Sequence, residues 1–208
     1  MNPVSNYILM AHRRRWPDRS ITLASCLWLL ACSPGLRLLV IHTMTRWLYL
    51  KRIAGGRTWF WRITYSPVAL LLKVAERHTN KTDIEKYCEI EGYVCFSDQG
   101  HIMFGAVKTG SGSVIGTRVT IGRNHADGGR PTIGRNVWIG SDCVIYGSIS
   151  IGDGATLLPG TVLSKNIPAN IVMQGNPARL VLQNFDNSEL RDLQDMDAIQ
   201  YIKTKWEA

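Results

Sequence analysis

The sequence is short of acidic residues and has no paired cysteines. Its 208 residues include 16 Asp and Glu against 24 Lys and Arg, which gives a formal net charge of +8. Charged residues make up only 19% of the chain, too few for long disordered tails. The five cysteines show neither a CxxC pair nor a metal-ligand spacing: Cys26, Cys32, Cys88, Cys95 and Cys143. We therefore expect free thiols in a reducing compartment, no disulfide framework and no bound metal.

Long apolar runs are also missing. Residues 21–31 are apolar, but a Ser-Pro-Gly breaker at 33–35 ends the run short of the about twenty residues that a membrane span needs. The arginines at 13–15 lead into a proline and an aspartate rather than an apolar core, which argues against a signal peptide. The sequence predicts a cytoplasmic protein, and peripheral contact with the inner membrane stays an open alternative.

Residues 1–90 are predicted to form an α-helical region. Two apolar stretches end on helix breakers, at 34–35 and 55–56, and a third helix is expected over 59–77. This region holds much of the positive charge and five of the seven tryptophans: Trp16, Trp28, Trp47, Trp59 and Trp61. Such a surface suits a core or oligomer interface with solvated arginines, or contact with a membrane, where Trp and Lys or Arg are enriched. We do not expect a nucleic-acid partner, because no binding motif accompanies the charge.

The central part of the chain repeats every six residues. Aliphatic residues recur at this interval with one exception: Ile115, Ile121, Ile133, Ile139, Ile145, Ile151, Leu157 and Leu163. Neither a helix nor a simple strand keeps this period, whereas a short strand plus a turn does. Three such units make one coil of a triangular prism. We therefore predict a mainly β fold, with a parallel β-helix over residues 91–183 and a C-terminal helix over 184–208.

The repeat is interrupted once, in the stretch IGRNHADGGRPTIG at residues 121–134. An aliphatic residue is due where Asp127 stands, and His125 takes a place that Val, Ala or Thr fills in other repeats. We expect the chain to leave the prism after Gly122 and to carry His125 on a short loop. An imidazole there can act as a general base. The Asn124 amide or a backbone N–H can stabilise an oxyanion, and Asp127 or a backbone carbonyl can fix the imidazole tautomer.

The stretch IGRNVWIGSDCVIYGSISIGDGATLLPGTVLSKNIPANIVMQGNPARLV, with VIGTRVTIG before it, resembles the hexapeptide-repeat acyltransferases, whose fold is a left-handed parallel β-helix. The resemblance covers residues 94–181. It implies a homotrimer that transfers an acyl group from acetyl-CoA to a hydroxyl or an amine. It also implies a lone catalytic histidine on a loop, often after Asn, as in Asn124-His125. Within the family the likeness is greatest to serine acetyltransferases and to O-acetyltransferases of bacterial surface polysaccharides.

The chain departs from the serine acetyltransferase pattern at two places. An Asp-His pair is expected where Lys108 and Thr109 stand, and a further histidine is expected at Arg130. We therefore expect the acceptor to be a sugar hydroxyl of a surface polysaccharide or its precursor. Serine, an amino-sugar nitrogen and a catalytically silent scaffold are the alternatives. His101, with Asp98 nearby, is the second candidate base.

The resemblance also implies six positions for the coenzyme: Trp138, Ser141, Pro159, Gly160, Lys165 and Arg179. The serine and the Pro-Gly pair would offer backbone hydrogen bonds to the pantetheine arm. The two cations would meet the phosphates. The tryptophan, expected to be exposed by its place in the repeat, would stack on adenine or a sugar, or pack between subunits.

Overall fold

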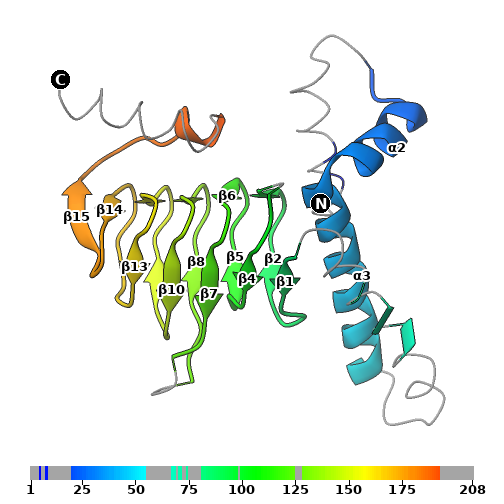
Figure 1. The fold of residues 1–208 in the computed structure, drawn as a ribbon, viewed down its shortest axis with the longest axis horizontal. Helices are drawn as coiled ribbons and strands as arrows, with labels where there is room; N and C mark the ends of the chain where they lie inside the picture. The colour runs from blue at the N-terminus through cyan, green and yellow to red at the C-terminus, as the bar shows by residue number, and fades with distance from the viewer. Residues whose placement is uncertain are drawn as a thin grey trace.

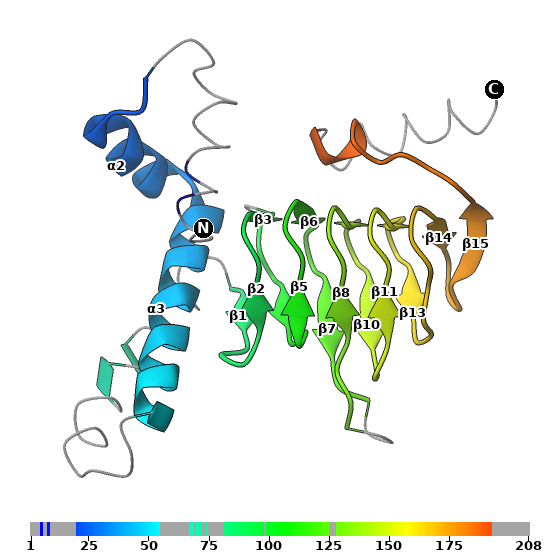
Figure 2. The ribbon, with the colours of Figure 1, turned by 180° about the vertical axis from the view of Figure 1, so that it is seen from behind.

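Most of the described chain is a parallel β-helix, and two helices stand across one of its ends (Figure 1). Seen from behind, the chain after the last strand turns back over the prism (Figure 2). The predicted fold class, a mainly β parallel β-helix preceded by helices, is confirmed. The computed structural model describes these residues: Ser5, Ile8, 20–54, 67–68, 70–71, 74, 81–97, 99–124 and 128–192.

Three sheets form the walls of the prism. Each of the first four coils adds one strand to each sheet, and the last coil meets sheet B only at a bridge between Ile151 and Ile167. Sheet A contains β1 (Asp83–Ile84), β4 (Met103–Phe104), β7 (Thr120–Gly122), β10 (Val144–Tyr146) and β13 (Val162–Leu163). Sheet B contains β2 (Glu89–Ile90), β5 (Lys108–Thr109), β8 (Thr132–Ile133) and β11 (Ser150–Ile151). Sheet C contains β3 (Val94–Phe96), β6 (Ser113–Ile115), β9 (Trp138–Ile139), β12 (Thr156–Leu157), β14 (Val172–Gln174) and β15 (Arg179–Leu182). Neighbouring strands are parallel, except that β15 pairs antiparallel with β14.

The interior of the prism is filled by the six-residue repeat. All eight aliphatic residues of the series are buried, with at most 2% of each exposed. The residues four positions later are buried beside them: Val119, Val137, Cys143, Ile149, Ala155 and Thr161. A narrow interior of this kind leaves no space for larger side chains. The predicted inward faces are therefore confirmed.

The glycines that follow the inward aliphatics are required by the close approach of successive coils. A Cβ on Gly116 would lie 2.7 Å from the Ser141 amide nitrogen, and one on Gly140 would lie 2.8 Å from the Pro159 ring. The left-handed backbone positions fall on other corner residues, among them Arg118, Asn136, Asp142, Gly154 and Gly160. Side chains at Gly116 or Gly140 would therefore push neighbouring coils apart.

The two N-terminal helices are joined by a sharp bend. Helix α2 (Leu23–Cys32) begins with a capping box, in which the Thr22 and Ser25 side chains and backbone amides bond reciprocally. Helix α3 (Pro34–Ala54) follows after one residue. Within the described residues no single helix is long and apolar enough to cross a membrane. The stretch from Leu23 to Lys51 meets that criterion only as a pair of helices, bent by 97°.

Helix α3 closes the first coil of the prism. Leu38 and Leu39 are fully buried in a core that is continuous with the prism interior. His42 Nε2 donates to the Cys88 carbonyl oxygen at 3.3 Å, and Arg46 Nη1 donates to the same oxygen at 2.6 Å. Burial lowers the pKa of His42 to about 4 and raises the pKa of the Cys88 thiol to about 12. The junction therefore contains a neutral imidazole and an unreactive thiol.

The ends of the prism differ in position from the sequence-based boundaries. Strand β1 begins at Asp83, so the first coil starts inside the stretch assigned to the helical region 1–90. The helix expected over 59–77 lies largely outside the described residues. Of the helix expected over 184–208, the described part has turns and a short 3₁₀ helix, η1 (Leu190–Asp192), and residues 193–208 lie outside the described residues.

Candidate active site

The interruption of the repeat is an insertion at the corner between sheets A and B. Ile145 pairs with Leu163 in the next coil, 18 positions later, whereas Ile121 pairs with Ile145, 24 positions later. One six-residue unit therefore leaves the prism between β7 and β8, while the strands on both sides keep their register. Figure 1 shows the limbs of this insertion projecting from the lower edge of the prism.

The limbs of the insertion are held against each other and against the wall. The Gly128 amide donates to the Asn124 carbonyl oxygen at 2.9 Å, which closes the base of the loop. A Cβ on Gly129 would overlap the Ser148 side chain, so the returning limb lies directly on the next coil. The described part of the insertion is thus fixed in place on a rigid scaffold.

Of the three predicted catalytic residues, Asn124 alone is described, half-buried at the base of the loop. His125 and Asp127 lie outside the described residues. The second candidate base, His101, is exposed at the corner between sheets C and A, with a left-handed φ of 59°. Its predicted neighbour Asp98 also lies outside the described residues. His101 and the insertion therefore stand at opposite edges of sheet A.

Arg130 ties the insertion to the first coil. Its Nη2 lies 2.5 Å from Glu85 Oε2, and its guanidinium carbon lies 5.1 Å from the centre of the Tyr87 ring. The Arg130 side chain is only 15% exposed. Tyr87 in turn packs edge-on against Tyr49 of α3, with ring centres 5.2 Å apart. The repeat pattern did not reveal Glu85 and Tyr87 as partners of Arg130, because both lie two coils away from it. Gly105 belongs to the coil between them.

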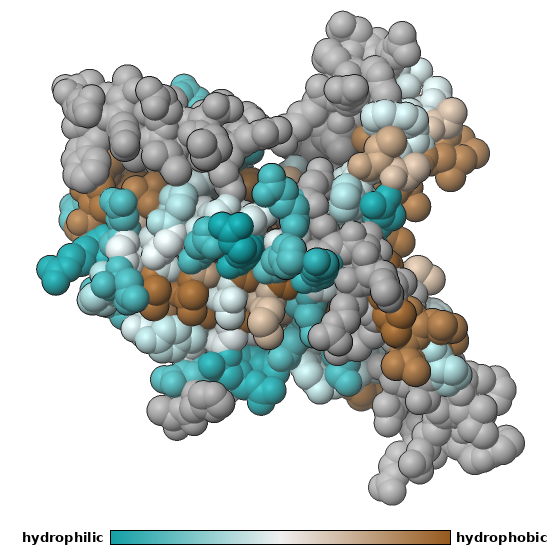
Figure 3. Space-filling view, viewed as in Figure 1, coloured by the Kyte–Doolittle hydropathy of each residue, from teal (hydrophilic) through white to brown (hydrophobic). Residues whose placement is uncertain are grey.

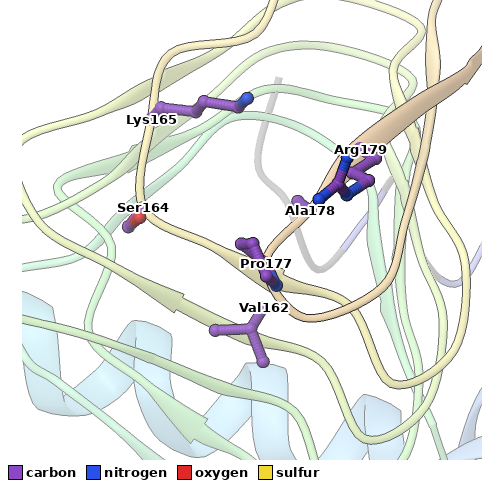
Figure 4. A pocket seen from close by; sticks show the side chains of 6 residues that line it. All are labelled: Val162, Ser164, Lys165, Pro177, Ala178 and Arg179. Carbon is purple, nitrogen blue, oxygen red and sulfur yellow. The ribbon is translucent and has the colours of Figure 1, made fainter.

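A pocket of about 290 Å³ opens at the last coil, along the same corner as the insertion. Its lining residues are Val162, Ser164, Lys165, Pro177, Ala178 and Arg179. The Ala178 amide donates to the Val162 carbonyl oxygen at 3.0 Å, which places the segment after β14 beside β13. Figure 4 shows the Lys165 side chain extending toward Arg179 across the pocket. The structure therefore brings together the two cations predicted for the coenzyme phosphates.

Three other positions predicted for the coenzyme lie on the opposite edge of sheet A. Ser141, Pro159 and Gly160 stack at the corner between sheets C and A. The Gly160 amide donates to the Ser141 carbonyl oxygen at 2.9 Å, and Ser141 Oγ accepts from the Thr117 amide at 3.2 Å. These groups bond within the wall of the prism. The hydrogen bonds predicted from these residues to the pantetheine arm stay a prediction.

The prediction that Trp138 is exposed is wrong. The side chain faces away from the prism interior, as its place in the repeat requires, yet it is only 1% exposed. Leu158 and Val172 pack beside it on sheet C, and Leu190 of the C-terminal segment packs with them. Half-buried Phe185 adds to this second core. Trp138 therefore anchors the returning chain and is not available for stacking on a coenzyme.

Sheet A connects the remaining candidates, because the insertion and the two-cation pocket lie on one of its edges and the corner of Ser141 lies on the other. Side chains that could hold a metal ion as a group of three or more are not found within the described residues. The arrangement offers an inserted loop, polar corners and a cationic pocket on one wall. It suits the binding of an extended phosphorylated molecule.

The parallel prism and its repeat define a class of β-helix proteins that includes many transferases. Residues 130–165 match the family model described as bacterial transferase hexapeptide (six repeats). Over these residues the prism of this chain is similar to the hexapeptide-repeat transferases.

Known relatives and neighbours of this chain are acetyltransferases. Galactoside O-acetyltransferase of Escherichia coli K12 is 39% identical over 93 residues, covering 45% of this chain and 36% of that protein. The chain thus spans about a third of that relative's length. Soybean serine acetyltransferase complexed with serine has a TM-score of 0.66 at 28% identity, covering 86% of this chain and 68% of that one. A serine acetyltransferase in complex with CoA shares the fold, with a TM-score of 0.60 at 22% identity, covering 86% and 68%.

Proposed function

We propose that this protein is an acetyl-CoA-dependent O-acetyltransferase that acts on a sugar hydroxyl of a surface polysaccharide or its precursor. One observation carries the proposal: the inserted repeat and the pocket of Lys165 and Arg179 share one corner of sheet A. They stand two coils apart, about 10 Å at the usual spacing of neighbouring strands. A coenzyme with its phosphates on the two cations can extend along the corner toward the insertion. The proposal includes the homotrimer that the resemblance implies and a cytoplasmic location.

The proposed reaction is a direct transfer with His125 as the base. The imidazole takes the proton of the acceptor hydroxyl as the oxygen attacks the thioester carbonyl carbon. The C–O bond forms, the C–S bond breaks, and the imidazolium returns the proton to the departing thiolate. Asn124 supplies a donor to the transient oxyanion, and Asp127 holds the imidazole tautomer. Neither a metal nor a covalent enzyme intermediate is needed.

Arg130 supports a sugar rather than serine as the acceptor. It occupies a place where serine acetyltransferases carry a histidine, and a guanidinium cannot accept a proton. Its contacts with Glu85 and Tyr87 give this residue a packing role at the junction with the first coil. The galactoside O-acetyltransferase among the relatives also acts on a sugar. Serine O-acetylation is the second candidate, because the soybean enzyme matches 86% of the chain, including the region before the prism.

Thiol release from acetyl-CoA tests the proposal, measured with neutral sugars, amino sugars and serine as acceptors. We expect release with a sugar, an O-acetylated product by mass spectrometry, and a loss of about 10²- to 10⁴-fold in kcat for His125→Ala. His101→Asn is the matched control, since Asn tolerates the left-handed backbone of that position. Full activity of His125→Ala would overturn the assigned base. Thiol release with serine as the only active acceptor would favour serine O-acetylation. A protein that binds no coenzyme A would favour the catalytically silent scaffold.

A further inference from the structure

Exposed apolar side chains of this protein gather on the N-terminal helices. Among the described residues, α2 and α3 expose eight large apolar side chains: Leu23, Leu27, Trp28, Leu30, Met44, Trp47, Leu50 and Ile53. The much larger prism exposes four: Tyr87, Met103, Val107 and Leu180. Figure 3 shows apolar surface over these helices on the side that faces away from the prism. Contiguous apolar surface of this kind marks an interaction site.

The two faces of α3 have different environments. Leu38, His42 and Thr45 recur at helical spacing and are buried, with His42 bonded to the first coil. On the opposite face, Trp47 is 56% exposed, and the Lys51 ammonium lies 5.8 Å from the centre of its ring. A tryptophan beside a lysine suits the boundary between lipid chains and headgroups, because both side chains are apolar with a polar tip. The outer face therefore has the composition of a membrane contact.

The positive charge of this region indicates which kind of partner surface it would bind. Residues 1–54 contain eight Lys and Arg and a single acidic residue, Asp18, and residues 20–54 contain no acidic residue. Two copies of these helices packed about a two-fold axis would bring cations together with no carboxylate from the helices between them. An anionic headgroup layer supplies the missing negative charge, and the apolar side chains enter the layer beneath.

We propose that the outer face of α2 and α3 docks on an anionic lipid bilayer. The prism extends from the other side of α3, so the insertion and the two-cation pocket stay open to solvent while the protein is bound. Membrane docking does not depend on acetyl transfer, because a catalytically silent scaffold with these helices would bind the bilayer in the same way. It brings the protein to a surface where lipid-linked acceptors are concentrated.

Vesicle sedimentation of the full chain tests the proposal. Phosphatidylcholine vesicles are compared with vesicles that also contain roughly a third of phosphatidylglycerol. We expect partitioning onto the anionic vesicles to exceed that onto neutral ones by about tenfold and to fall as salt rises. The double variant Trp47→Ser/Leu50→Ser should weaken partitioning onto the anionic vesicles by about tenfold or more. Circular dichroism verifies that each variant is folded.

The prism supplies the matched control, Met103→Ser/Leu180→Ser. These side chains are 61% and 49% exposed, against 56% and 50% for Trp47 and Leu50. We expect the control to partition like the wild type. Absence of wild-type binding to anionic vesicles, or equal loss in both double variants, would overturn the proposal. A lower assembly mass of the α3 variant by light scattering, with vesicle binding unchanged, would assign the surface to a second copy instead.

Discussion

At the scale of single residues, His42 makes the stability of the protein depend on pH. Its imidazole is buried at the junction of α3 and the first coil, and burial, opposed in part by the bond to Cys88 and assisted by the Arg46 charge, lowers its pKa to about 4. The unfolded chain, whose histidine titrates at about 6.5, therefore binds the extra proton between these values. The free energy of unfolding should fall by about 2–3 kcal/mol as the pH drops from 6.5 to 4.

Denaturant unfolding across this pH range measures the effect. The variant His42→Gln keeps a donor for the Cys88 carbonyl but cannot titrate, so its stability should change less than that of the wild type in this window. His101→Gln, at an exposed position, should follow the wild type. Equal losses in the wild type and His42→Gln would show that other groups carry the acid sensitivity.

Trp138 shows what a repeat pattern can and cannot tell about one residue. The six-residue period correctly indicates which way a side chain points, because the period follows from the coil itself. It carries no information about what lies outside the prism. Trp138 is buried by Leu190, more than fifty positions later, and no local pattern links the two. Exposure was predicted wrongly for this reason.

At the scale of elements, Asn187 is the buried polar anchor of the segment after β15, which also bonds to the prism through the Phe185 amide and the Arg191 side chain. Asn187 is 3% exposed, and its Nδ2 donates to the carbonyl oxygens of Asn136 and Gly154 at 2.8 and 3.2 Å. The variant Asn187→Asp would place a carboxylate against these acceptors, at a cost of about 1–3 kcal/mol. Leu190 would then lose its place beside Trp138. We expect amides of residues 184–192 to exchange hydrogen about tenfold faster or more, measured by mass spectrometry.

Asn184→Asp is the control for the same chemical change, because Asn184 is exposed in the same segment. Its exchange should match the wild type, and the peptides of sheets A and B should be unaffected in both variants. Unchanged exchange in Asn187→Asp would mean that the apolar contacts of Leu190 hold the segment without the asparagine.

Elements inside the repeat were predictable because the inward aliphatics recur every six positions and pair with those of the next coil at a fixed interval of 18 positions. The insertion was predictable for the same reason: the register resumes at Ile133, after one lost unit. The beginning of the prism was not predictable, since its first strands, Asp83–Ile84 and Glu89–Ile90, precede the regular part of the pattern. The contact of Arg130 with Glu85 also escaped prediction, because it joins corners of different coils.

At the scale of the whole molecule, the insertion on the third coil and the two-cation pocket on the last coil lie along one corner of the prism. If the pocket binds the phosphates of coenzyme A, Lys165→Gln/Arg179→Gln should weaken that binding by about 10- to 100-fold, since charge-assisted bonds to phosphate are lost. Binding of pantetheine, which has no phosphates, should be unchanged. Calorimetry with both ligands separates the loss of charge from a general distortion.

Lys108→Gln on sheet B, a cation paired with Glu91, is the control and should bind coenzyme A like the wild type. Equal weakening for pantetheine, or none for coenzyme A, would exclude this pocket as the phosphate site and place the coenzyme elsewhere on sheet A.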